Sequence, residues 1–103
     1  MVFGVMGGQY QAAGHVHFLS NILDFGMDLQ EAIDAPRVFA TPEGLWIEDN
    51  LDDATRKELS DLGHKLVRRK PPIGGAQAIR IDRERGLLIG ASDPRKDGVA
   101  LGY

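Results

Sequence analysis

The stretch Val2-Phe3-Gly4-Val5-Met6-Gly7-Gly8 constrains the fold of this 103-residue chain more than any other. Its first five residues predict a short buried strand over 2–6, and the Gly7-Gly8 pair breaks that strand. The apolar residues that follow recur at helical spacing on one face, at Ala12, Val16, Leu19 and Leu23, and Phe18 and Ile22 widen this stripe. This stripe predicts a helix over 9–25. The chain is therefore expected to begin with a strand, a tight glycine turn and a long helix.

Capping signals delimit two further helices. Gly26 suits the left-handed conformation that ends a helix. Asp28 and Glu31 have the spacing of a capping box, which predicts a short helix over 29–35 that Pro36 ends. A third helix is expected to begin at Asp52 or Asn50 and to close at Gly63.

Short apolar runs between polar turns predict the remaining strands, over 37–40, 44–48, 64–69, 76–82, 87–92 and 99–103. A polar turn, Arg83-Glu84-Arg85-Gly86, joins two of them. This order predicts an α+β fold, with a mostly antiparallel sheet and helices packed on one face. We expect a single domain or domain fragment over 1–103.

Composition excludes several classes of protein. Twelve basic and 15 acidic residues give a net charge of −3, which argues against a dedicated nucleic-acid binder. The absence of cysteine excludes disulfides, thiolate zinc sites and a cysteine nucleophile. No apolar run approaches the roughly 18 residues that span a membrane, and the N-terminus lacks signal-peptide features. The compartment stays open, with the cytoplasm slightly favoured.

The Gly7-Gly8 pair is the candidate site. Glycine lets a ligand approach backbone N–H groups closely, and the first N–H groups of a helix are unpaired. A strand end that leads through two glycines into a helix can therefore hold an anion or a developing oxyanion. The alternative is a tight turn without a ligand.

Other polar residues favour structural roles. His15 and His17 point about 200° apart on a helix, so they do not share a metal ion, and His64 stands alone. Asp49, Asp52 and Asp53 lack the pattern of a calcium loop, and they suit a solvated helix start. The basic run 68–70 suits a solvated edge strand. We therefore expect no metal and no cofactor.

No complete catalytic set is present. The Ser and Thr residues lie in no Gly-x-Ser-x-Gly or Ser-x-x-Lys pattern, and residue 1 is Met rather than a Thr or Ser nucleophile. The residues alone offer a possible oxyanion corner and nothing more.

Several motifs together resemble the gamma-glutamyltranspeptidase family, in order and spacing, over essentially the whole chain. They are Val5-Met6-Gly7-Gly8, Asn21-Ile22-Leu23-Asp24-Phe25-Gly26-Met27, Ala35-Pro36-Arg37, Leu62-Gly63-His64-Lys65-Leu66, Gly75-Ala76-Gln77-Ala78-Ile79 and Gly90-Ala91-Ser92-Asp93-Pro94-Arg95. The resemblance is to the C-terminal part of the family's small, catalytic subunit.

This resemblance implies part of an N-terminal-nucleophile hydrolase, a four-layer αββα sandwich. In such enzymes a precursor cleaves itself, and a new N-terminal Thr transfers a gamma-glutamyl group from glutathione-like amides to water or an amine. Gly7 and Gly8 match the positions that donate N–H groups to the oxyanion. The Thr and the substrate-holding polar residues lie upstream of the matched region, and Met6-Gly7-Gly8 is nearer to acylase-like relatives.

Three readings of function follow. In the first, the chain is the C-terminal segment of such an enzyme, supplies the oxyanion corner but no nucleophile, and is inactive alone. It would then bind the missing N-terminal part, or a second copy of itself, and meet a gamma-glutamyl substrate only in the assembled enzyme. In the second, it is an inactive structural or interaction module derived from the family. In the third, it is a small anion-binding module that uses Gly7 and Gly8.

Overall fold

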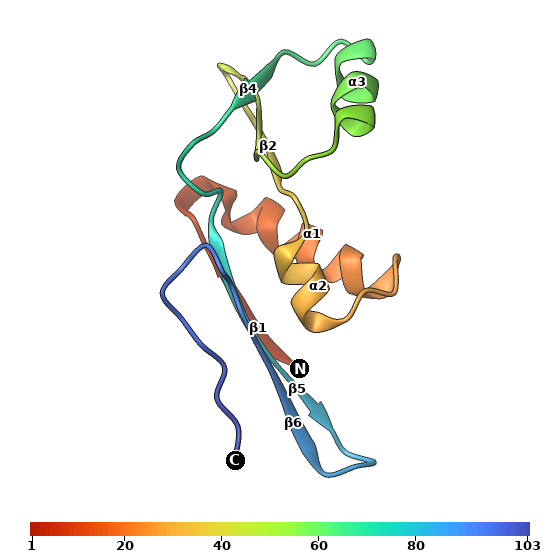
Figure 1. The fold of residues 1–103 in the computed structure, drawn as a ribbon, viewed down its shortest axis with the longest axis vertical. Helices are drawn as coiled ribbons and strands as arrows, with labels where there is room; N and C mark the ends of the chain where they lie inside the picture. The colour runs from red at the N-terminus through yellow and green to blue at the C-terminus, as the bar shows by residue number, and fades with distance from the viewer. The chain divides into compact units, whose positions relative to one another are not determined.

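The computed structural model describes residues 1–103, which divide into two compact units. Unit 1 comprises Met1–Ala35 and Gly74–Tyr103, and unit 2 comprises Pro36–Ile73. Each unit contains one three-stranded sheet and its own helices (Figure 1). The α+β class predicted from the sequence is confirmed, but the strands form two sheets instead of one.

The sheet of unit 1 is entirely antiparallel. Strand β5 (Gly75–Asp82) lies in the centre, between β1 (Val2–Met6) and β6 (Leu87–Ser92). Val5 pairs with Ala76, and Ala78 pairs with Ala91. All four of these residues are buried and lie on one face of the sheet.

Helices α1 (Gln11–Leu23) and α2 (Leu29–Asp34) pack on this face of the sheet, on the same side (Figure 1). The predicted capping box is present: the Asp28 carboxylate accepts from the Glu31 N–H at 2.8 Å, and the Glu31 carboxylate accepts from the Asp28 N–H at 3.0 Å. Two of the four N–H groups that a helix start leaves unpaired are thereby satisfied.

The apolar stripe of α1 is buried only in part. Phe18 is buried as the stripe predicts, but Val16 and Leu23 are 69% and 74% exposed, and Gly14 and Asn21 are buried in their place. The reason is steric, because a Cβ at Gly14 would lie 2.6 Å from Val5 Cγ1. Only a residue without a side chain lets α1 approach β1 this closely, so the glycine sets the rotation of the helix.

Unit 2 has a mixed sheet. Strands β2 (Val38–Thr41) and β3 (Gly44–Ile47) form an antiparallel hairpin, and β4 (Leu66–Arg68) runs parallel to β3. The parallel pairing requires a crossover, which α3 (Asp53–Asp61) provides. The core of this unit consists of Leu45, Ile47 and Leu51.

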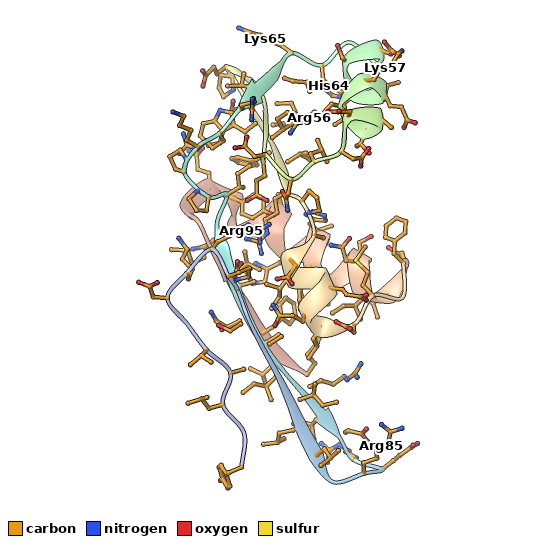
Figure 2. All side chains as sticks on the ribbon, in the orientation of Figure 1. Arg56, Lys57, His64, Lys65, Arg85 and Arg95 are labelled. Atoms are coloured by element: carbon orange, nitrogen blue, oxygen red, sulfur yellow. The ribbon has the colours of Figure 1, made fainter.

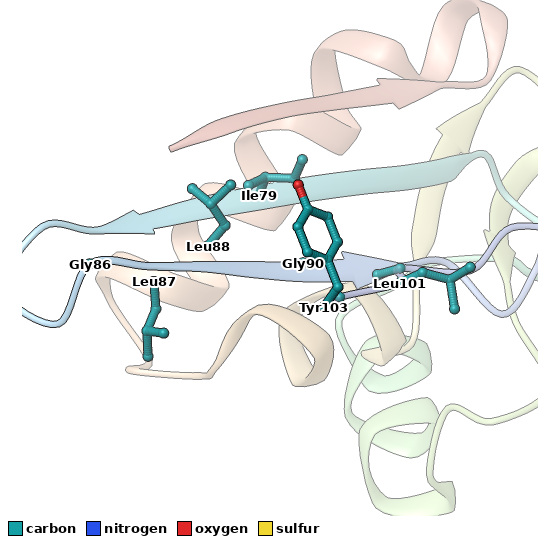
Figure 3. A pocket seen from close by; sticks show the side chains of 9 residues that line it. Ile79, Gly86, Leu87, Leu88, Gly90, Leu101 and Tyr103 are labelled. Carbon is teal, nitrogen blue, oxygen red and sulfur yellow. The ribbon is translucent and has the colours of Figure 1, made fainter.

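The predicted strand over 99–103 is absent from the structure. This segment lies instead beside the face of the β5–β6 hairpin that points away from the helices. A Cβ added at Gly90 would lie 3.0 Å from the Cβ of Ala100. A groove of about 390 Å³ opens between the hairpin and residues 100–103 (Figure 3). None of the helices is both long and apolar enough to cross a membrane.

Helix α3 provides a test of capping by a carboxylate. The Thr55 backbone N–H, at 2.7 Å, and the Thr55 hydroxyl, at 2.8 Å, donate to Asp52 and lower the pKa of this carboxyl. A carboxyl whose pKa is lower in the folded than in the unfolded chain stabilises the folded state at pH values above its unfolded pKa of about 4. This stabilisation is lost as the pH falls through the lower pKa of the folded state. We expect Asp52→Asn to remove this part of the acid dependence of unfolding, measured by denaturation at several pH values. An unchanged pH profile in Asp52→Asn would contradict the assignment.

Candidate functional site

The Gly7-Gly8 corner lies at the place the sequence predicts, between the end of β1 and the start of a helix. Gly7 has φ 144° and Gly8 has φ 59°, values that residues with a side chain rarely adopt. The chain then forms a 3₁₀ turn, η1 (Gly8–Tyr10), which continues directly into α1. The turn is closed by the Tyr10 N–H, which donates to the Gly7 carbonyl at 3.1 Å.

On one side, the Gly7-Gly8 corner packs closely against Gly74. A Cβ on Gly7 would lie 2.9 Å from Gly74 Cα, so the two backbones are in direct contact. A Cβ on Gly74 would lie 2.6 Å from the Met6 carbonyl oxygen and 2.7 Å from the Tyr10 ring. Gly8 differs, because a Cβ there would meet nothing within 4 Å. The corner is therefore packed beneath Gly7 and open above Gly8.

Two N–H groups are available at the corner. Neither the Gly7 nor the Gly8 N–H donates a hydrogen bond in the loops and helix ends, and no side chain caps the turn. Unpaired N–H groups at the start of a helix carry partial positive charge. The arrangement can therefore bind an anion, or an oxygen on which negative charge develops.

The other candidates from the sequence have structural partners or stand apart. The His15 ring lies 2.6 Å from the Gln11 carbonyl and packs on Phe3, while His64 is exposed. Asp49 pairs with Arg68 at 2.9 Å on the surface of unit 2. No group of three His, Cys, Asp or Glu residues is arranged to hold a metal ion.

Asp93 and Arg95 form a buried pair, a role that the sequence analysis did not predict, since it named both residues only as part of a family motif. Asp93 is fully buried, and it accepts from the Ala76 N–H at 2.7 Å and the Arg95 N–H at 2.9 Å. The Arg95 guanidinium lies 3.2 Å from Asp93 and donates to the carbonyls of Ile33 and Ala35, at the end of α2. The pair thus joins β5, α2 and the end of β6, and Figure 2 shows Arg95 at the end of the β5–β6 hairpin opposite its turn.

Unit 2 contains a second buried charged network. The Glu48 carboxylate accepts from the backbone N–H groups of Arg37, at 3.0 Å, and Ile73, at 3.3 Å. The Arg37 guanidinium donates to the Ile73 carbonyl at 2.9 Å. The first and last segments of unit 2 are thereby joined. A charged residue at the end of an apolar strand, Glu48 or Asp93, is the signal in the sequence that indicates such a network.

Comparison with known proteins identifies relatives along the whole chain. The family model for gamma-glutamyltranspeptidase matches residues 1–103. The glutathione hydrolase-like YwrD proenzyme of Bacillus subtilis is 38% identical over 99% of this chain and 21% of its own length. Cephalosporin acylase from Bacillus halodurans is 36% identical with a TM-score of 0.86, over 98% of this chain and 20% of that one.

A gamma-glutamyltranspeptidase from Pseudomonas nitroreducens, solved as a complex with L-DON, superposes with a TM-score of 0.87 at 29% identity. The alignment covers 99% of this chain and 54% of that chain. The chain thus spans about a fifth of the length of the YwrD proenzyme, and it corresponds to the C-terminal part of its relatives.

The buried pair can be tested by its effect on stability. Asp93→Ala leaves the Ala76 N–H and the Arg95 guanidinium without their buried acceptor, so the free energy of unfolding should fall by about 3 kcal/mol. Urea denaturation of the chain measures this change. The control is Asp97→Ala, an exposed carboxylate in the same loop, with an expected change within about 0.5 kcal/mol. Equal effects of the two substitutions would contradict the role of Asp93.

Proposed function

Because the chain belongs to the gamma-glutamyltranspeptidase family, we propose that it forms the oxyanion-binding part of an enzyme that hydrolyses or transfers the acyl group of amides. The observation that carries this proposal is the pair of N–H groups at Gly7 and Gly8, which are free of other bonds beside a helix start. Such donors stabilise the negative charge that forms on the carbonyl oxygen of an amide under attack.

The nucleophile is supplied by a second segment. None of the Ser and Thr residues of the chain lies in a recognised nucleophile motif, and the family resemblance assigns the attacking hydroxyl to an upstream N-terminal Thr. That hydroxyl adds to the amide carbon and its proton passes to a base. The oxyanion is held at Gly7 and Gly8 until the amine leaves with a proton. The acyl group then passes to water or to an amine acceptor.

The open face of the unit 1 sheet, which points away from the helices and is only partly lined by residues 100–103, supports the requirement for a second segment. Five apolar side chains alternate with the helix-facing residues and are 44–73% exposed: Val2, Met6, Ile79, Ile81 and Leu88. Contiguous apolar faces of this kind are typical of surfaces that another element covers. The αββα sandwich that the resemblance implies would place a second sheet on this face.

The relatives do not specify which acyl group the proposed site accepts. The names of three relatives are a glutathione hydrolase-like proenzyme, a gamma-glutamyltranspeptidase and a cephalosporin acylase, which suggest acyl substrates of more than one kind. Met6-Gly7-Gly8 leaves this range open, because the two glycine N–H groups recognise the oxygen that all amides share.

The oxyanion role can be tested without changing any side chain. Replacing Gly8 by glycolate converts its amide to an ester and removes one N–H while keeping the backbone shape. In the chain assembled with the Thr-bearing upstream segment, kcat for gamma-glutamyl p-nitroanilide should fall about a hundredfold or more, with little change in KM. The same replacement at exposed Gly102 is the control. An unchanged kcat for the Gly8 ester would show that its N–H does not bind the oxyanion.

The open face of the unit 1 sheet gives a separate prediction. Ile79→Asp places a charge on the open face, where assembly would bury it without a partner, so the dissociation constant from the upstream segment should rise at least about tenfold. Sedimentation of the mixed polypeptides measures this constant. The control is Leu62→Asp in unit 2, where the side chain is 77% exposed. Equal binding by Ile79→Asp and the wild-type chain would contradict assembly through this face.

A further inference from the structure

The side chain of Lys96 lies against the strand that supports the Gly7-Gly8 corner. A Cβ on Gly75 would lie 2.7 Å from both Cγ and Cε of Lys96, and 3.2 Å from its Cδ. The methylene stem of the lysine therefore runs along Gly75 and occupies the space that any side chain at this position would need. Glycine at position 75 is what allows the lysine to lie there.

Gly75 places this lysine beside the corner. It is the first residue of β5 and pairs with Met6, the residue before Gly7. The preceding residue, Gly74, is the one whose backbone contacts Gly7. Ala76 faces the helices, and successive residues of a strand point to opposite faces. Lys96 therefore lies on the open face of the sheet, at the end that carries Gly7.

The backbone beneath Lys96 is fixed to the same strand. The Lys96 N–H donates to the Asp93 carbonyl at 3.1 Å, which closes a turn over 93–96. The Asp93 carboxylate accepts from the N–H of Ala76, the residue after Gly75, at 2.7 Å. The turn that contains Lys96 is thus anchored next to Gly75, which the Lys96 side chain crosses. The buried Asp93–Arg95 pair therefore fixes the position of Lys96.

The charge of Lys96 is not neutralised within the chain. Its ammonium group takes part in none of the salt bridges, and its side chain is exposed. The neighbouring cation, Arg95, is held by a buried carboxylate and by two carbonyls. Lys96 is therefore a cation beside the corner that can pair with a group from outside the chain.

We propose that Lys96 is a specificity-determining residue that binds a carboxylate of the substrate, so that the site prefers anionic amides. This inference rests on the proposed function. A lysine ammonium is a compact charge on a flexible stem, which can reach a carboxylate while Gly75 holds its base. The positive end of α1 at the corner favours the same charge.

The test compares three amide substrates in the assembled enzyme. Butyryl p-nitroanilide is neutral, glutaryl p-nitroanilide carries a carboxylate on the acyl group, and butyryl carboxy-p-nitroanilide carries one on the leaving amine. The measured quantity is the ratio of kcat/KM for each carboxylated substrate to that for the neutral one. In Lys96→Met we expect this ratio to fall about tenfold for one of the two carboxylated substrates, mainly through KM. The substrate affected identifies the side on which the carboxylate binds.

Two variants separate a specific contact from a general effect of charge. Lys96→Arg keeps the cation and should retain most of the wild-type ratio. Arg85→Met removes one positive charge at the opposite end of the same hairpin (Figure 2), where Arg85 is 77% exposed, and should leave the ratio unchanged. An unchanged ratio for both carboxylated substrates in Lys96→Met overturns the role of Lys96 but not the proposed function. Absence of turnover with every amide, in the wild-type assembly, overturns both.

Discussion

The buried carboxylate of Asp93 is the interaction on which unit 1 depends. It accepts from the Ala76 N–H at the start of β5, and it holds the Arg95 guanidinium that donates to the end of α2. A carboxylate without solvent is stable only when it is paired and hydrogen-bonded, so these contacts form together or not at all. β5 begins at Gly75, directly after Gly74, and these two glycines contact the stem of Lys96 and the Gly7-Gly8 corner, respectively.

Close contacts between backbone segments are a second constraint on the structure of unit 1. Gly14 admits α1 against β1, Gly74 admits Gly7, and small residues at Ala76, Ala78 and Ala91 line the buried face of the sheet. A layer built from residues this small lets helix and sheet pack closely, which fixes the corner at the head of α1 with little freedom. A preorganised site for a developing charge requires such rigidity, because donors that must move first contribute less to the transition state.

Local patterns predicted most elements well. The capping box at Asp28 and Glu31, the cap at Asp52 and the β5–β6 hairpin are present near their predicted bounds, since each depends on residues close together in the chain. The strand predicted over 99–103 is absent, and the apolar stripe of α1 is buried only in part, at Phe18 but not at Val16 or Leu23. Both differences have the same origin, because apolar periodicity indicates a helix or a strand but does not specify which of its apolar residues the tertiary contacts of this chain bury.

The sequence by itself determined the class of fold, the place of the Gly7-Gly8 corner between a strand and a helix, and the family, because these are encoded in short contiguous motifs. Only the tertiary structure decided that the strands form two sheets, that Asp93 joins Ala76, and that Lys96 crosses Gly75. These contacts join residues 17 and 21 positions apart, and their energies depend on burial and on missing Cβ atoms. No local pattern specifies such contacts, since they exist only once the chain has folded back on itself.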